Sequence, residues 1–246
     1  MTRKCYIAIL GMLAMFLVTS SASLWAGTNL GLQLTSGMAT ETICDNNVNY
    51  AGCTGNAADL NPALGGITFI GPVGAWQMNT TSGFGPPMEQ LVPFLDISTF
   101  NATTGGGAAP LTVLLSASGI TSFKGVLEAI DTLGGTSTFA GTTITSQAWL
   151  SAANTPFCAS TSCGAVALTS LLTATGRSYN ATVSGIGNFP NSPFAITLAV
   201  TIDSHGQADT TSFDNEFDIP EPAALSLLGS GLFGFGLAFR RMLLRA

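Results

Sequence analysis

The middle of this chain is divided into short segments by closely spaced glycine, asparagine and proline residues. These residues favour turns over long helices, while the segments between them are rich in residues that favour strands. The segment 194–202 shows a period of two, in which every second residue is large and apolar: Phe194, Ile196, Leu198, Val200 and Ile202. Such alternation places the apolar side chains on one face of a strand. We therefore expect many short strands joined by turns.

Roughly eight to ten segments of this kind follow one another, which predicts an all-β domain with a β-sandwich or jelly-roll-like fold. One segment is ambiguous, because the apolar residues between Phe123 and Leu133 suit either a short helix or a distorted strand. No repeat of fixed length is visible, which argues against a solenoid.

The first 26 residues have the layout of a secretory signal peptide. Arg3 and Lys4 precede an apolar run from Ile7 to Val18, and small residues follow it. Cleavage is plausible after Ala22 or after Ala26. The sequence thus predicts an N-terminal signal helix, export through the Sec translocon, and removal of residues 1–26 by signal peptidase.

The other end of the chain carries a second apolar segment. Residues 223–239 contain no charge, and a helix of that length spans about 26 Å, enough for a thin bilayer. Two prolines, Pro220 and Pro222, set its N-terminal boundary because proline cannot continue a helix from that side. Three arginines follow it and are expected to anchor the far end in the cytoplasm: Arg240, Arg241 and Arg245.

The order of Pro220-Glu221-Pro222, a glycine-rich apolar helix and a basic end resembles the PEP-CTERM sorting signal. The resemblance covers about residues 219–246, and the basic end is less arginine-rich than usual in that family. It implies a Gram-negative bacterium, an inner-membrane precursor, and cleavage near the motif by an exosortase, a membrane-embedded transpeptidase-like protease. It says almost nothing about the activity of the remaining chain.

The region between the termini is acidic. Residues 27–219 carry twelve acidic and two basic residues, a net charge of −10, which makes nucleic-acid binding very unfavourable. We expect an exported domain over residues 27–212, an acidic spacer over 213–219, and the sorting signal over 220–246. The segments "NPALGGITFIGPVGAWQMNTTSG" and "DTTSFDNEFDIPEP" resemble an uncharacterised group of exported β-domains, which implies a β-sandwich and no activity.

Four cysteines remain after the signal peptide, in two pairs that are close in sequence: Cys44 with Cys53, and Cys158 with Cys163. In an oxidising compartment two local disulfides are the economical arrangement, although four cysteines allow three pairings. A zinc site is disfavoured because neither spacing is typical of zinc ligands.

No set of residues has the pattern of an active site. His205 is the only histidine, no G-x-S-x-G motif accompanies it, and the acids fit the solvation of a poorly charged surface. We therefore predict no enzymatic activity, no cofactor and no metal.

The leading hypothesis is an exported protein of the cell surface or extracellular matrix, associated with exopolysaccharide or biofilm. The first alternative is a carbohydrate-binding module in which Trp76 or Trp149 stacks on a sugar. Ice binding and a secreted hydrolase are weaker alternatives, and no threonine array of useful length along a strand supports the former.

Overall fold

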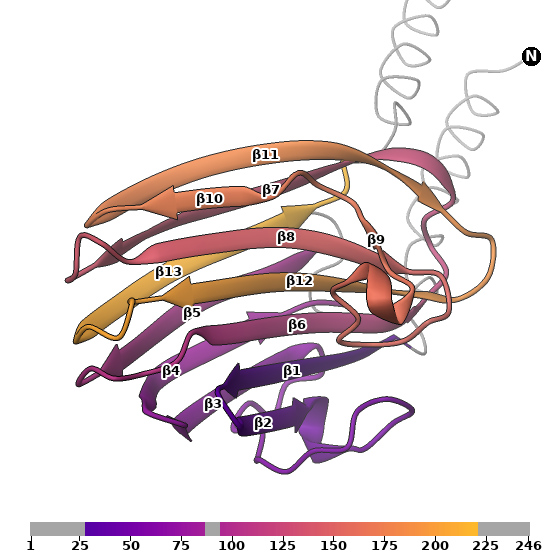
Figure 1. Ribbon diagram of the computed structural model, residues 1–246. Coiled ribbons are helices and arrows are strands. Elements are labelled where there is room, and N and C mark those ends of the chain that lie inside the picture. Colours follow the sequence, from indigo (N-terminus) through magenta and orange to yellow (C-terminus); the bar gives the residue numbers. More distant parts are fainter. Residues whose placement is uncertain (1–27, 87–93, 221–246) are drawn as a thin grey trace, which may run out of the picture.

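The alternating segments form antiparallel strands in a computed structural model, which describes residues 28–86 and 94–220. The strands make two sheets that lie face to face, one in front of the other in Figure 1. The strand order is β10-β8-β12-β6-β1-β2 in the first, the β1 sheet, with β9 beside β8. The second, the β13 sheet, has the order β11-β7-β13-β5-β4-β3. An all-β, sandwich-like fold is thereby confirmed.

The strands of both sheets are short to medium in length. The β1 sheet consists of β1 (Asn29–Ser36), β2 (Ala39–Cys44), β6 (Leu111–Ile120), β8 (Thr143–Ser151), β9 (Val166–Ala167), β10 (Leu172–Thr175) and β12 (Phe194–Asp203). The β13 sheet consists of β3 (Gly66–Val73), β4 (Trp76–Phe84), β5 (Leu95–Thr104), β7 (Gly125–Ser137), β11 (Ser178–Phe189) and β13 (Asp209–Asp218).

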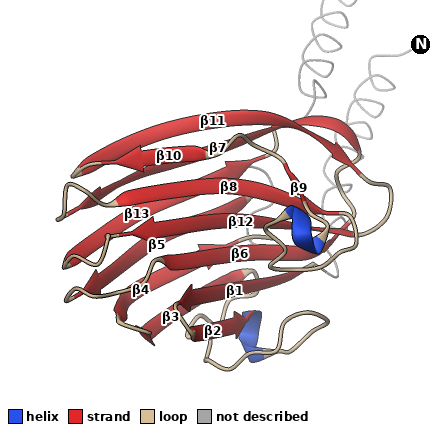
Figure 2. Cartoon of the chain, viewed as in Figure 1, coloured by secondary structure: helices blue, strands red, loops and turns tan. Residues whose placement is uncertain are grey.

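Helices contribute little to the part of the chain that the structure describes. Figure 2 shows two short ones, which are the 3₁₀ turns η1 (Asp45–Asn47) and η2 (Thr161–Cys163). Neither has the length or the apolar character that a membrane crossing requires. The signal helix and the C-terminal helix expected from the sequence lie outside the described residues.

The ambiguous segment 123–133 forms most of β7, not a helix. It pairs with β11 along one edge and with β13 along the other. Leu127, Ala129 and Leu133 point into the sandwich and are buried. Pairing on both sides thus decides between two conformations that the local pattern allowed.

The prediction of an acidic spacer over residues 213–219 is wrong. These residues continue β13, an interior strand that pairs with β5 on one side and β7 on the other. Phe213, Phe217 and Ile219 are buried, while the acids between them face outward. The alternation of phenylalanine and acid is the pattern of a half-buried strand, so the domain extends to Ile219.

The core lies between the two sheets and is closed at one end by phenylalanines. Phe94 contacts Phe123 and Phe217, with ring centroids 5.2 Å and 6.5 Å apart, both edge to face. Phe189 continues the cluster, 6.0 Å from Phe123 and 5.7 Å from Phe194. Such aromatic pairs add to the stabilisation that burial of their area provides.

Candidate functional site

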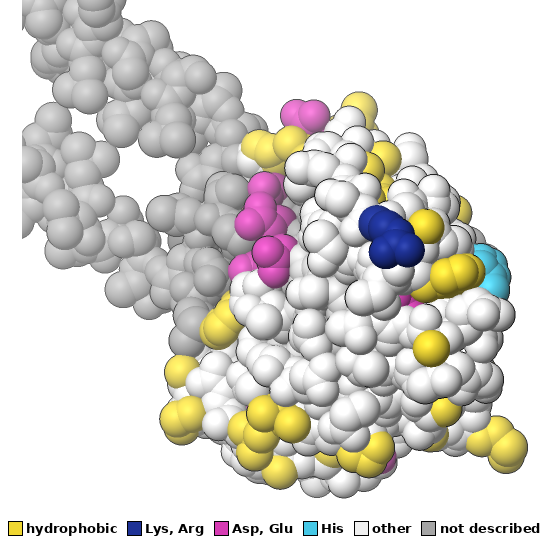
Figure 3. Space-filling model, turned by 90° about the vertical axis from the view of Figure 1, so that its left-hand side faces the viewer, with side chains coloured by type: hydrophobic (Ala, Val, Ile, Leu, Met, Phe, Trp, Pro, Cys, Tyr) yellow, Lys and Arg dark blue, Asp and Glu magenta, His cyan; other side chains and the backbone are white. Residues whose placement is uncertain are grey.

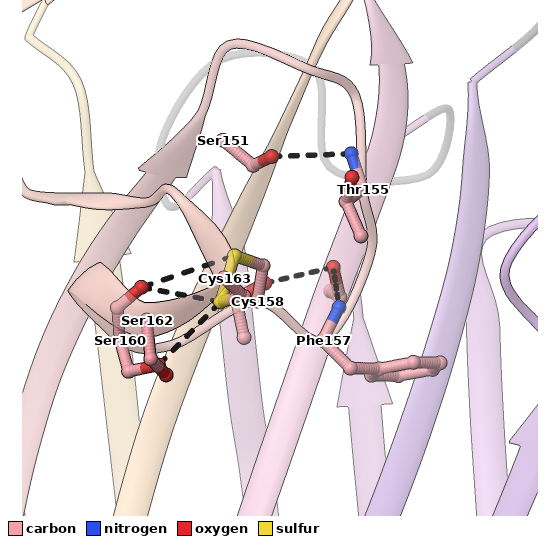
Figure 4. Close-up of a disulfide and its surroundings, with 9 residues drawn as sticks. Ser151, Thr155, Phe157, Cys158, Ser160, Ser162 and Cys163 are labelled. Atoms are coloured by element: carbon pink, nitrogen blue, oxygen red, sulfur yellow. Dashed lines mark hydrogen bonds between the residues drawn. A yellow bond between two sulfur atoms is a disulfide. The ribbon is translucent and has the colours of Figure 1, made fainter.

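Both local disulfides expected from the sequence are present, Cys44–Cys53 and Cys158–Cys163. The first joins the end of β2 to the loop that follows it. The second closes the loop between β8 and β9 around η2, as Figure 4 shows. In the loop-entropy model each cross-link stabilises the fold by roughly 2–3 kcal/mol.

The second disulfide loop covers part of the outer face of the β1 sheet. The backbone N–H of Phe157, which is drawn in Figure 4, donates to Ser116 Oγ at 3.2 Å, and Ser116 Oγ lies 3.0 Å from Thr197 Oγ1. Gly31 permits this approach, because a Cβ there would lie 2.6 Å from the Phe157 ring and 2.6 Å from the Tyr50 hydroxyl. No local sequence pattern predicted that this loop would cover the sheet.

The uncovered part of the same outer face has few charges. One row of threonines crosses six adjacent strands in register: Thr173, Thr145, Thr201, Thr112, Thr35 and Thr40. The next row contains Gln147, Ala199, Leu114, Gln33 and Thr42. The face therefore offers hydroxyl and amide groups, which suit hydrogen bonding to a neutral polar ligand.

The threonine row also bears on ice binding. Thr112 Oγ1 lies 3.4 Å from Thr201 Oγ1, and Thr35 Oγ1 lies 3.2 Å from Thr40 Oγ1. Hydroxyls turned toward each other in pairs break the even spacing of about 4.8 Å that the strands would otherwise impose. The row is better explained by cross-strand Thr–Thr pairs that stabilise the sheet.

The two candidate stacking residues occupy different environments. Trp76 is 1% exposed, and its indole N–H donates to the Ala109 carbonyl at 2.9 Å. A sugar cannot reach its ring, so the prediction of a stacking role for Trp76 is wrong. Trp149 is half-buried on the outer face of β8, beside Thr197 of β12 and Ala167 of β9, and stays a candidate.

The outer face of the β13 sheet is acidic. It carries Asp96, Glu128, Asp214, Glu216 and Asp218, and Figure 3 shows acidic side chains gathered on one side of the molecule. Partial burial raises the pKa of Asp214, and burial followed by the nearby Glu216 charge raises the pKa of Asp218. Among the described residues no three metal-binding side chains come together.

His205 lies in the turn between β12 and β13 and has the order of contacts that a catalytic triad would have. Its Nδ1 is 3.3 Å from Asp203 Oδ2, and its Nε2 is 3.4 Å from Thr143 Oγ1. The histidine and aspartate side chains are 55% and 35% exposed. Water at such a site weakens the electrostatic stabilisation that catalysis requires, so the geometry does not favour a hydrolase.

The sorting residues lie at the edge of the described chain. Pro220 follows the buried Ile219 directly. Glu221, Pro222 and the three arginines Arg240, Arg241 and Arg245 lie outside the described residues.

Residues 218–241 match the PEP-CTERM protein-sorting motif. The chain carries a PEP-CTERM sorting signal. The PEP-CTERM match confirms the resemblance seen in the sequence and marks the chain as an exosortase substrate, with a membrane-held precursor that is exported. It begins at Asp218, the last residue of β13, so the signal starts on the final strand of the sandwich.

A search of curated proteins finds no match to this chain. Among solved structures, TmCBM61 in complex with β-1,4-galactotriose is 10% identical with a TM-score of 0.30, over 59% of this chain and 82% of that one. The CBM22-1 xylan-binding domain from Paenibacillus barcinonensis Xyn10C is 7% identical with a TM-score of 0.33, over 65% and 89%. Likenesses this weak support no inference about a ligand.

Proposed function

We propose that this chain is an exported, non-enzymatic protein of the cell surface or extracellular matrix. Residues 1–26 direct secretion, and residues 223–239 hold the precursor in the inner membrane with the acidic domain outside the cytoplasm. Exosortase then cuts near Pro220-Glu221-Pro222. The mature product is then associated with exopolysaccharide or biofilm at the cell surface.

One observation carries this proposal: the last strand of the sandwich ends at Asp218, before the Pro220-Glu221-Pro222 motif begins. The last strand, β13, pairs with β5 as far as Phe217 and with β7 as far as Asp218, and Ile219 is 1% exposed. The Phe94 backbone N–H donates to the Phe217 carbonyl at 2.8 Å. Removal of everything after Pro220 would therefore leave the core and both disulfides in place. This supports a tail that serves as a disposable address and not as part of the fold.

The intact mass of the mature protein tests the sorting route. We expect a C-terminus close to residues 220–222 in a strain that contains an exosortase, and an uncut, membrane-bound chain when the exosortase gene is deleted. Secreted material that still ends at Ala246 would contradict processing.

A second candidate function is supported by Trp149. Trp149 is partly exposed on a face with hydroxyl and amide groups and few charges, whereas the opposite face is acidic. An aromatic ring flanked by hydrogen-bonding groups is a suitable platform for a sugar ring. A face with few acids also limits repulsion of an anionic exopolysaccharide. We therefore propose the outer face of the β1 sheet as the polysaccharide-binding surface.

Glycan-array binding tests this surface. Trp149→Ala should abolish binding to any polysaccharide that the wild-type domain retains. Ile186→Ala is the matched control, because it removes an apolar side chain that is 75% exposed on the opposite sheet. Equal loss in both variants, or no loss in either, would count against the surface. Turnover of an ester or glycoside that depends on His205 would instead favour a hydrolase.

A further inference from the structure

The two points where the described chain begins and ends lie at the same end of the sandwich. β1 runs away from this end, and β13 runs toward it, as Figure 1 shows. The pairings agree: β1 and β12 both run antiparallel to β6, and β13 returns from the turn that follows β12. We call this the exit end and define it by the loops 45–65, 121–124, 152–165 and 190–193.

No linker separates the exit end from the predicted membrane helix. Ile219 is buried, and the apolar segment starts at Ala223. Four residue steps span at most roughly 14 Å even when fully extended. Once residues 223–239 are in a bilayer, the exit end can therefore lie only a short distance from the lipid headgroups.

The exit end presents side chains that suit a headgroup layer. Val48 and Leu64 are 63% and 60% exposed and line a small hollow with Thr28, where the described chain begins. Val126 is 70% exposed near the start of β7, two residues after the exposed Lys124. Val126 also lies two residues before Glu128 on the acidic face, so the apolar side chains, and not the local charge, fit the boundary between lipid tails and headgroups.

The exit end also resists deformation. Cys44–Cys53 closes the first part of loop 45–65, and Cys158–Cys163 closes part of loop 152–165. The two loops meet over Gly31, where the Tyr50 hydroxyl and the Phe157 ring both lie close to the backbone. A cross-linked surface of this kind keeps its shape when it meets another surface.

We propose that, in the precursor, the exit end rests on the outer surface of the inner membrane, with Val48, Leu64 and Val126 toward the phospholipid headgroups. The proposal rests on the membrane anchor of the proposed function. It places the start of the sorting signal at the membrane surface, between lipid and a folded domain, where a membrane-embedded protease meets it.

Quenching by labelled lipids tests this orientation in the full-length chain. The chain is reconstituted in vesicles of phosphatidylethanolamine and phosphatidylglycerol that carry a headgroup spin label. A fluorophore is attached through a non-natural residue at Asn191, at the exit end, or at Gly105, at the opposite end; a Cβ at Gly105 would meet no atom within 4 Å. We expect quenching at position 191 to exceed quenching at position 105 several-fold.

A flexible insert provides the matched control. About 20 Gly-Ser residues between Ile219 and Pro220 would add roughly 25 Å of reach and should remove most of the difference between the two positions. Val126→Asp should lower quenching at position 191 without loss of the fold, because that side chain is exposed. Equal quenching at both positions in a chain that floats with the vesicles would overturn the orientation alone. A chain that does not float with the vesicles would overturn the anchor, and with it the proposed function.

Discussion

Two aspartates of the β13 sheet point into the sandwich and are almost fully buried, yet their surroundings favour opposite charge states. Asp209, at the start of β13, accepts hydrogen bonds from five groups: the hydroxyls of Ser137, Thr138, Thr142 and Thr211 and the backbone N–H of Phe139. Burial acts to raise the pKa of Asp209, but these donors outweigh it and hold the pKa at about 2. The carboxylate is ionised and satisfied.

Asp131, in the middle of β7, has far fewer donors. Asn215 Nδ2 donates to its Oδ1 at 2.7 Å, and Ser146 Oγ lies 2.8 Å from its Oδ2. Ser146 Oγ also lies 2.8 Å from Asn215 Oδ1, and one hydroxyl proton cannot serve both contacts. A proton on Asp131 completes the ring, because the acid then donates to Ser146 and Ser146 donates to Asn215. Burial, the largest effect, raises the pKa of Asp131 in the same sense.

The number of available donors therefore decides the charge of a buried carboxyl in this domain. Asp209 lies beside a turn, where backbone and hydroxyl donors converge. Asp131 lies between two sheets whose backbone groups are already paired.

Asp209→Ala should lower the free energy of unfolding by about 3–5 kcal/mol, because the substitution leaves several buried donors without an acceptor. Urea unfolding of the mature domain measures the loss. Asp203→Ala is the control, since that side chain is 35% exposed and its loss should cost about 0.5 kcal/mol or less. Similar losses in the two variants would show that the Asp209 network has no special role.

Ser146→Ala should cost about 1–3 kcal/mol, because both Asp131 and Asn215 lose a partner in the core. Ser184→Ala, on the exposed face of β11, serves as the comparison and should be near neutral. A neutral Ser146→Ala would contradict the closed ring.

Thr142→Val should cost about 1 kcal/mol and raise the pKa of Asp209, since it removes one of five donors while it keeps the shape of the side chain. Titration of the carboxyl carbon by NMR measures the pKa in the wild type and the variant. An unchanged pKa would mean that the remaining donors hold the charge without Thr142.

Asp131→Asn should have the smallest effect on the free energy of unfolding at acid pH, because the amide replaces a protonated acid. The native pKa of Asp131 is raised, so its contribution to stability is fully present below the unfolded pKa, about 3.9, and is lost as pH rises through the native pKa. The variant should therefore gain stability relative to the wild type as pH rises above about 4. Asp209, whose pKa is lowered, contributes above the unfolded pKa and loses that contribution as pH falls toward about 2. A constant difference between variant and wild type across this range would show that Asp131 is ionised.

Much of the fold could be predicted because local patterns are strong in this chain. The alternation from Phe194 to Ile202 predicted a strand, and β12 occupies these residues. The close pairs Cys44–Cys53 and Cys158–Cys163 predicted local disulfides. The Pro220-Glu221-Pro222 motif with its apolar and basic continuation identified the sorting signal.

The errors arose where partners distant in sequence decided the outcome. The acids of 213–219 suggested a spacer, yet β5 and β7 provide hydrogen bonds on both sides and make the segment an interior strand. Trp76 and Trp149 were equivalent as candidates in the sequence, and only the packing of the two sheets buried the first. The threonine row was invisible because its members come from six strands.

The β architecture, the local disulfides and the sorting signal could be predicted from the amino-acid sequence, because each depends on residues that are close together along the chain. The packing of the two sheets was needed to set the sheet order, the loop that covers Ser116, the opposite pKa shifts of Asp131 and Asp209, and the common end at which the described chain begins and ends. These depend on strand register and on desolvation, which arise when segments far apart in the chain meet.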